Sequence, residues 1–397
     1  MGVTMMPFQP QVRVGIVDGG SFGLRLEGVY DVDASEDSVC YCPTSNDCYA
    51  EVSGIKIGKD FHWQREMTQR FHGRIMIKRV NDEKSILINM LPAEEYLESV
   101  ISSEMNPNAH PEFLKVHAII SRSWLLKMLR MPRIKRSQDF TSRNGEIISW
   151  TDVEAHSDYD VCADDHCQRY QGITRVNDAA IRAVRQTSGI ILTDDNDNIV
   201  DARFSKCCGG RSELFSSAWQ NVDFDYLQPI DETYCDPAQM THDEKEKIIH
   251  TILNDFDAET DDFFAWTTEV SASDVKRNLM TKFNVAIGDV INLKASKRGP
   301  SGRIVELLVE GSNGNIVIGK ELNIRRLLSD SHLYSSAFEA ERIINDKGEI
   351  IFRLVGRGWG HGVGLCQIGA AIMAERGYSY IDILKHYYKG VKLEKIY

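Results

Sequence analysis

The chain has 397 residues, of which 42% are hydrophobic, enough for a sizeable core in two domains or in one large domain with an insertion. A formal net charge of −12 argues against nucleic acid as a general partner, because phosphate binding relies on a basic surface. No apolar run approaches the ~20 residues that span a bilayer. The first ten residues lack an apolar signal segment, so we expect a cytosolic protein or an exported one whose signal lies outside this chain.

Nine cysteines cannot all pair within one chain, because the number is odd. Their grouping indicates a mixture of disulfides, metal ligands and free thiols, which fits an exported location. The groups are Cys40, Cys42 and Cys48; Cys162 and Cys167; Cys207, Cys208 and Cys235; and Cys366.

Residues 11–90 are predicted to be rich in β-strands. The runs 12–17, 22–26, 74–80 and 85–89 carry branched and apolar residues in loose alternation. A helix is predicted to begin after Leu91-Pro92, since proline suits the first helical turn.

The helix predicted over 93–105 carries the first candidate for catalysis. Four of its residues fall at helical spacing on one face: Leu97, Val100, Ile101 and Glu104. The acids Glu94, Glu95 and Glu98 can face solvent. A carboxyl group on a buried stripe is disfavoured as an anion, so we expect a raised pKa for Glu104, as a general acid requires. The alternative is that the Glu104 carboxylate reaches water past Met105.

The helix predicted from Pro111 to about residue 130 is apolar almost all round and should be buried. Lys115 and Arg122 nevertheless share one of its faces. Buried cations need partners, so this face should meet an acid or a polar ligand. The alternative is that both side chains extend to water at a surface edge.

Beyond a basic, polar stretch over 131–150, predicted to be an exposed loop, lie three residues with the spacing of metal ligands. His156, Cys162 and Cys167 have the residue types and separations typical of zinc, with His166 as a spare ligand. Cys162 and Cys167 could instead form a small disulfide loop beside a surface histidine.

The second half of the chain alternates between the two types of element. We predict a helix over 177–188, strands over 190–193 and 199–204, an acidic excursion over 229–265, and strands with one helix, 273–283, over 268–350. Near the end, Ser379 is a predicted N-cap with the acid Asp382 three residues on.

Six glycines lie within residues 356–370, after a predicted strand and before a helix that stops at Gly377. The loop carries Trp359, His361, Cys366 and Gln367, but it has neither the P-loop nor the dinucleotide-binding pattern. It therefore either presents a site or is a structural turn with a satisfied histidine. A cysteine hydrolase that uses Cys366 and His361 has no evident third group to orient the histidine.

Three stretches together resemble the stage II sporulation protein D and amidase-enhancer (SpoIID/LytB) family. The third stretch is long and highly specific, and the resemblance covers nearly the whole chain from about residue 12. The stretches are 91–97 (LPAEEYL) with 103–105 (SEM) and 112–124 (EFLKVHAIISRSW); 205–213 (SKCCGGRSE); and 358–367 (GWGHGVGLCQ) with 369–370 and 386–390 (HYYKG).

The resemblance implies an α+β fold in which helices and antiparallel strands surround one catalytic groove, with a β-rich excursion. We divide the family-like unit 11–397 into a β-rich part (11–90), catalytic helices with a zinc loop (91–228), an acidic insertion (229–265), a β-rich subdomain (266–350) and the glycine loop with the last helices (351–397). Its implied activity is lytic cleavage of peptidoglycan glycan strands, especially strands without stem peptides, in the cell envelope.

The family's catalytic acid matches Glu104, which the helical spacing had already singled out. Zinc is implied at His156, Cys162 and Cys167, and no organic cofactor is expected. His117 stands where the family usually has glutamine. The expected substrate-binding residues are Lys115, Arg122, Ser205, Gly209, His361, Gln367 and Tyr387.

One carboxylate suffices for a lytic transglycosylase, whereas a glycoside hydrolase usually needs two. We further predict that the glycine loop forms a wall of the groove that holds Glu104. The rival interpretation is a protein that binds peptidoglycan or activates an amidase without cleaving the glycan.

Overall fold

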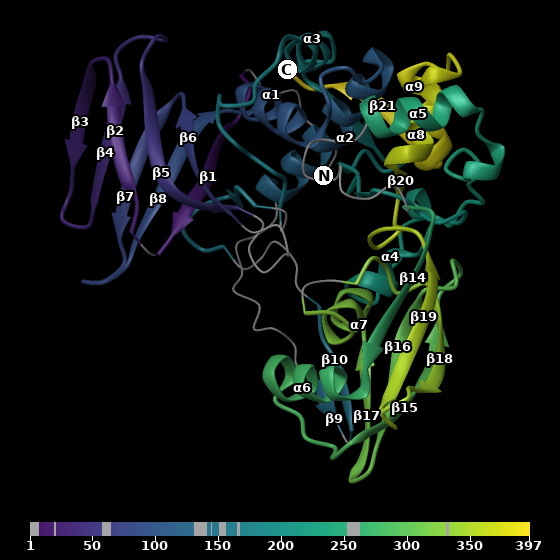
Figure 1. Cartoon of the computed structure of the whole chain (residues 1–397). Coiled ribbons are helices and arrows are strands. Elements are labelled where there is room, and N and C mark those ends of the chain that lie inside the picture. The colour runs from purple at the N-terminus through teal and green to yellow at the C-terminus, as the bar shows by residue number, and fades with distance from the viewer. Residues whose placement is uncertain are drawn as a thin grey trace.

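The computed structural model describes residues 8–19, 21–57, 65–130, 141–143, 145–150, 156–164, 167–251, 263–330 and 333–397. Most of the predicted start segment, most of the predicted loop 131–150, the spare ligand His166 and residues 252–262 of the acidic excursion lie outside these ranges. Strands gather in two regions, with a helical layer at the top between them (Figure 1). Together with the mixed and antiparallel sheets, this confirms the α+β class. Among the described helices, none combines the length and hydropathy needed to cross a bilayer.

The first region consists of a six-stranded sheet in the order β11-β1-β8-β7-β4-β3 and a three-stranded sheet in the order β2-β5-β6. Strand β8 is buried on both faces. Its residues Leu87 and Leu91 join the main core, and Ile86 and Ile88 form a small cluster with Tyr159. The strands are β1 (Gln11–Asp18), β2 (Gly23–Glu27), β3 (Tyr30–Ala34), β4 (Ser38–Pro43), β5 (Tyr49–Ile57), β6 (Arg65–Phe71), β7 (Arg74–Arg79), β8 (Ser85–Pro92) and β11 (Val161–Cys162).

The helical layer begins with α1 (Ala93–Glu104) and α2 (Pro111–Arg130), close to the predicted bounds. In α9, Ser379 and Asp382 form the predicted capping box. The other elements here are α3 (Asp178–Gln186), α4 (Phe215–Ala218), α5 (His242–Thr251), α8 (Gln367–Glu375), α9 (Tyr380–Tyr387), the 3-10 turns η2 (Asp225–Leu227) and η3 (Pro237–Gln239), and the strand pairs β12 (Ile190–Thr193) with β21 (Lys392–Lys395) and β13 (Phe204–Ser205) with β20 (Leu365–Cys366).

The strand predicted over 199–204 is wrong for most of its length. Only Phe204 and Ser205 pair as β13, and Ile199 makes a single bridge. Between them the backbone turns, because the Arg203 N–H donates to the Asp201 carbonyl while the Arg203 guanidinium pairs with the Asp201 carboxylate at 2.7 Å. This local bonding competes with extension of the strand.

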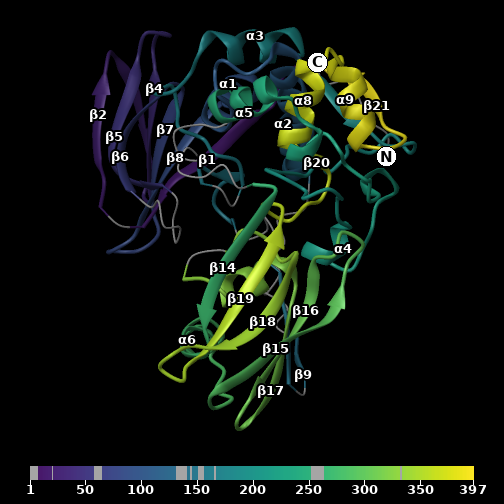
Figure 2. The ribbon, with the colours of Figure 1, turned by 45° about the vertical axis from the view of Figure 1, so that its right-hand side comes forward.

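The second β-rich region has its own hydrophobic core, built around Trp266, Leu307, Ile318 and Phe352. Figure 2 shows β14, β19 and β18 side by side in this region. A five-stranded sheet in the order β15-β16-β17-β10-β9 completes it. The elements are β9 (Thr141–Arg143), β10 (Glu146–Ile148), β14 (Ala265–Ser271), α6 (Ala272–Phe283), β15 (Val290–Arg298), β16 (Ile304–Gly311), β17 (Gly314–Gly319), α7 (Glu321–Leu327), β18 (Phe338–Ile344) and β19 (Ile350–Arg357).

A buried ion pair joins α1 to α2. The Arg122 side chain is 0% exposed and donates two bonds of 2.8 Å to the two Glu94 carboxylate oxygens. The same guanidinium donates to the carbonyls of Val184 and Ile190. The helical spacing had indicated that Glu94 can face solvent. Its carboxylate instead faces Arg122, because it is the acid that this buried cation requires. A bidentate pair of this kind has fixed geometry as well as charge attraction.

Replacing Arg122 with methionine should destabilise the fold by about 3–5 kcal/mol, because it removes the guanidinium that balances the charge of the buried Glu94 carboxylate. Urea unfolding followed by circular dichroism measures this loss. The matched control is Arg185→Met, which removes an exposed pair with Glu98 and should cost no more than about 1 kcal/mol. The double variant Glu94→Gln/Arg122→Met should recover part of the loss. Equal costs for the Arg122 and Arg185 variants would contradict this assignment.

His117 lies inside α2 with its ring between Phe113 and Phe204, at centroid distances of 4.7 and 5.2 Å. Neither ring nitrogen has a hydrogen-bond partner among the described residues. Burial, with the nearby Lys206 charge, lowers the pKa of His117 from 6.5 to about 3. The imidazole is therefore neutral in the folded protein, whereas the unfolded chain binds a proton below about pH 6.5.

Stability should consequently fall as the pH drops from 6.5 towards 3, by up to about 1.4 kcal/mol per pH unit for His117 alone. His117→Gln should remove the contribution of this one proton to the pH dependence of stability. Denaturation measured at several pH values tests the prediction, with the exposed His242→Gln as the control. An unchanged slope in the His117 variant would refute it.

Candidate functional site

Glu104 is the last residue of α1, at the end of a stripe that is otherwise fully buried. Leu97, Val100 and Ile101 are each 0% exposed, as the wheel predicts, while Glu104 is half-buried. The backbone N–H of Arg169 donates to Glu104 Oε1 at 2.9 Å. The carboxylate therefore sits at the edge of the core, oriented by a main-chain donor from a distant loop.

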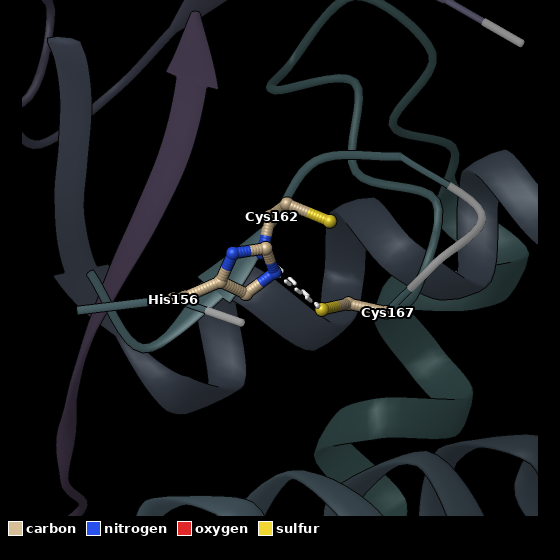
Figure 3. Close-up of side chains that lie close together, drawn as sticks. All are labelled: His156, Cys162 and Cys167. Carbon is tan, nitrogen blue, oxygen red and sulfur yellow. Dashed lines mark hydrogen bonds between the residues drawn. The ribbon is translucent and has the colours of Figure 1, made fainter. Parts of the chain in front are cut away.

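His156, Cys162 and Cys167 converge as their spacing predicts (Figure 3). Their ligand atoms all lie within 4.8 Å of one another, and His156 Nε2 is 3.5 Å from Cys167 Sγ. Strand β11 places Cys162 by pairing in parallel with β1, where it lies opposite Gly15. Two ligands on a tetrahedral zinc ion lie about 3.6 Å apart, so one nitrogen and two sulfurs in this arrangement fit the metal.

The loop that carries the two cysteines also holds Glu104. Arg169, the donor to Glu104, follows Cys167 by two residues, and Gln168 accepts a hydrogen bond of 3.3 Å from Tyr96 of α1. A little farther on, Ser99 of α1 donates to the Gly172 carbonyl at 2.6 Å. The cysteine loop thus runs along α1, so that anything fixing this loop also fixes the catalytic candidate.

The two predicted cations of α2 have separate environments. The Lys115 ammonium lies 2.7 Å from Glu112 Oε1 and 5.7 Å from the centroid of the Tyr380 ring, and its side chain is partly exposed. Arg122 is enclosed by Glu94 and main-chain carbonyls, so it does not extend to a surface edge and serves the fold. Of the two, only Lys115 has a partly exposed side chain, and its role in substrate binding stays a prediction.

The glycine loop is packed against the segment that follows β13. The Cys207 and Trp359 backbones exchange hydrogen bonds of 3.1 and 2.8 Å. A Cβ atom at Gly209 would lie 2.8 Å from the Gly358 nitrogen, and one at Gly362 would lie 2.4 Å from the Arg303 guanidinium. Both glycines also have positive φ, so their positions require glycine for packing and for conformation.

His361 is oriented within the loop itself, because its Nδ1 accepts the Val363 N–H at 3.0 Å and its ring contacts Trp219 at 4.8 Å. Burial and the charges of neighbouring arginines hold the pKa of His361 well below its usual value. The imidazole is therefore a neutral group. These contacts involve different segments from those of Glu104, so a groove shared by the two residues stays a prediction.

The remaining predicted substrate-binding residues lie in the protein interior. Ser205 pairs with Cys366 in the β13–β20 ladder, Gln367 is 4% exposed at the start of α8, and Tyr387 is 1% exposed. Burial raises the pKa of Tyr387, so its hydroxyl stays protonated. Ser205 and Tyr387 also lie against the glycine loop, since Cβ atoms at Gly360 and Gly369 would come within 3.2 Å of Ser205 and 2.4 Å of Tyr387.

Sequence reasoning missed a second group of candidate ligands. Cys207, Cys235 and Cys366 are buried and bring their sulfurs within 4.8 Å of one another. Cys366 thus faces other cysteines while His361 Nδ1 bonds to Val363, an arrangement that does not support a Cys366–His361 hydrolase. The sequence did contain a signal for this group, because two of the three family-like motifs, 205–213 and 358–367, each carry cysteines.

Comparisons with known proteins agree with the motifs. Residues 81–193 match the family model described as "Stage II sporulation protein", and residues 213–364 match a domain of unknown function. Stage II sporulation protein D of Bacillus amyloliquefaciens is 26% identical over 315 residues, which cover 78% of this chain and 76% of the relative.

Two further relatives show the same likeness. An uncharacterized protein of Brachyspira hyodysenteriae is 26% identical over 346 residues, covering 86% of this chain and 78% of that protein. The amidase enhancer of Bacillus subtilis is 24% identical over 228 residues, covering 53% of this chain and 32% of that protein. The chain thus carries a stage II sporulation protein domain and resembles the stage II sporulation protein D and amidase-enhancer family, as its three motifs predict.

Proposed function

We propose that this protein is a lytic transglycosylase that cleaves the glycan strands of peptidoglycan, chiefly strands without stem peptides, in the bacterial cell envelope. The observation that carries the proposal is the Glu104 carboxylate. It ends a fully buried helical stripe, accepts the Arg169 N–H at 2.9 Å and lies beside the loop of Cys162 and Cys167. Such a carboxyl group, partly withdrawn from water and held in one orientation, suits proton transfer.

One carboxyl group can perform both halves of this reaction. The protonated acid gives its proton to the glycosidic oxygen as the bond from that oxygen to C1 of the muramic acid residue breaks. The carboxylate so formed takes the proton of the 6-hydroxyl of the same residue, and that oxygen bonds to C1. The products are a free hydroxyl on the departing sugar and a 1,6-anhydro end, and no water is consumed. Arg169 would keep one carboxylate oxygen fixed throughout.

His156, Cys162 and Cys167 would hold a zinc ion in this proposal. Three protein ligands leave a fourth position, at which zinc can polarise a bound water or ligand. The chain's own contribution is positional. With Cys162 tied to β1 through β11 and Cys167 two residues before Arg169, a fixed ligand set restrains the donor to Glu104.

A second candidate is a protein that activates an amidase without cleaving glycan, which the likeness to the amidase enhancer of Bacillus subtilis favours. Mass spectrometry of soluble fragments separates the two functions. Purified protein alone releases 1,6-anhydro glycan fragments from amidase-treated cell walls if it is the transglycosylase. An activator releases none and instead raises the rate of an added amidase.

Glu104→Gln should lower the release of 1,6-anhydro products at least about 100-fold, since general acid and base catalysis commonly contributes ~10²–10⁴-fold. The amide has the shape of the carboxyl group but cannot transfer the proton. Glu95→Gln, an exposed change on the same helix, is the matched control and should retain activity. A folded Glu104→Gln protein with normal turnover would eliminate Glu104 as the acid.

Cys162→Ser should remove about one equivalent of zinc per chain from protein purified without chelator, because two strong ligands do not hold the ion as three do. Metal analysis by mass spectrometry measures the difference from the unvaried protein. Cys48→Ser, a change at a buried thiol of the first β-rich region, is the control and should leave the zinc content unchanged. The assignment would be contradicted if the protein without substitutions had a disulfide between Cys162 and Cys167, and if its zinc content equalled that of the Cys162→Ser variant.

A further inference from the structure

Four buried cysteines converge behind the glycine loop. Cys207 and Cys208 follow β13, Cys235 lies in the turn before η3, and Cys366 ends β20. Their exposed fractions are 0%, 2%, 1% and 0%. The sulfurs of Cys207, Cys235 and Cys366 all lie within 4.8 Å of one another, and Cys208 Sγ is 3.5 Å from Cys235 Sγ. Sulfurs from three separate segments therefore surround one point.

The sulfurs of Cys207, Cys235 and Cys366 have a spacing that fits three corners of a metal tetrahedron, and Cys208 Sγ, 3.5 Å from Cys235 Sγ, offers the fourth ligand. Zinc–thiolate bonds of about 2.3 Å place neighbouring sulfurs about 3.8 Å apart. A disulfide joins sulfurs in exclusive pairs, whereas here Cys235 has Cys207, Cys208 and Cys366 as neighbours at once. We propose that Cys207, Cys208, Cys235 and Cys366 form a buried tetrathiolate zinc site, separate from His156, Cys162 and Cys167.

The backbone holds these cysteines together independently of their sulfurs. Phe204 and Ser205 pair in parallel with Leu365 and Cys366, and the Cys207 and Trp359 main chains bond to each other in both directions. The Cys208 N–H donates to Cys366 Sγ at 3.3 Å. N–H donors to the ligand atoms orient them and are a regular part of protein metal sites. The ligand set is thus prepared by the fold.

The buried Arg303 brings a positive charge to the edge of the proposed site, and the buried Glu232 carboxylate brings a negative charge near Cys235. Four thiolates around Zn²⁺ leave a net charge of about −2, which is costly to bury without compensation. Arg303, 0% exposed, donates to the Cys208 carbonyl at 3.1 Å. Its other described acceptors, the Gly360 carbonyl and the Ser301 hydroxyl, are neutral. The Glu213 carboxylate accepts a hydrogen bond from Ser301 and does not bond to Arg303 directly among the described contacts. A buried guanidinium without a direct carboxylate partner among the described residues lies next to the proposed complex.

The chemistry of the donors indicates what binds and what the site does. Thiolates are soft ligands that select zinc over magnesium or calcium. Four protein ligands close the coordination shell, so this ion would be structural, in contrast to a site with three ligands. It would fasten the start of α8 and the end of the glycine loop to the segment that follows β13. The proposal does not depend on Glu104 being catalytic.

The test begins with the unvaried full-length protein, purified without chelator. Metal analysis should find about two zinc ions per chain, and zinc-edge X-ray absorption should show a shell at about 2.3 Å in which sulfur outnumbers nitrogen and oxygen. The site with His156 alone supplies at most as much sulfur as lighter ligands. About one zinc per chain with a mixed shell, or disulfides among the four cysteines in non-reducing peptide mapping, would overturn the proposal.

Variants then locate the second ion. In a Cys162→Ser background, X-ray absorption should report sulfur alone around the remaining zinc. Adding Cys235→Ser should remove that zinc, whereas adding Cys48→Ser should not. Retention of all the zinc after Cys235→Ser would refute the assignment. If the Cys235 variant fails to fold, the zinc content and X-ray absorption of the protein without substitutions still decide whether the proposal is right.

Discussion

The pairing of Arg122 with Glu94 is the constraint on which the helical layer depends. The guanidinium binds Glu94 of α1 from its place in α2, and it also satisfies the carbonyls of Val184 and Ile190. Glu94 in turn accepts the Gly189 N–H at 3.4 Å and the hydroxyl of Tyr397 at the chain's end. One buried charge pair therefore fixes α1, the α3–β12 turn and the C-terminus around α2, and so sets the direction in which α1 presents Glu104.

The sequence predicts this layer well where the signal is local. Helical spacing locates α1 and α2 close to their observed bounds, and the stripe ending in Glu104 is buried as expected. The sequence does not reveal that Glu94, rather than a ligand, pairs with Arg122. Helical spacing shows which face of a helix a residue lies on, but not which residue of another helix it contacts. Likewise, the sequence of residues 199–204 predicts a strand, because it does not reveal that Arg203 bonds to Asp201 within the segment.

The two cysteine groups show the same limit. His156, Cys162 and Cys167 lie within twelve residues, so their spacing alone predicts that they meet. Cys207 and Cys366 are 159 residues apart, and it is the pairing of β13 with β20, together with the backbone bonds between Cys207 and Trp359, that brings them close. The glycines of the loop follow the same logic: Gly362 is needed because the Arg303 guanidinium occupies the space of its missing side chain, a contact that no pattern in the loop itself contains.

The five-stranded sheet has a consequence for how this architecture can vary among relatives. Its strands β9 and β10 come from the segment after α2, more than a hundred residues before β15, and β10 lies beside β17 with Ile147 in the core. The matched domain of residues 213–364 omits them. The second β-rich region is therefore not an independent domain, encoded by one continuous segment, that could be exchanged as a unit between relatives. Replacing residues 213–364 alone would remove the β17 that pairs with β10 and the core that surrounds Ile147. Changes in this segment and in the segment of β9 and β10 must therefore occur together.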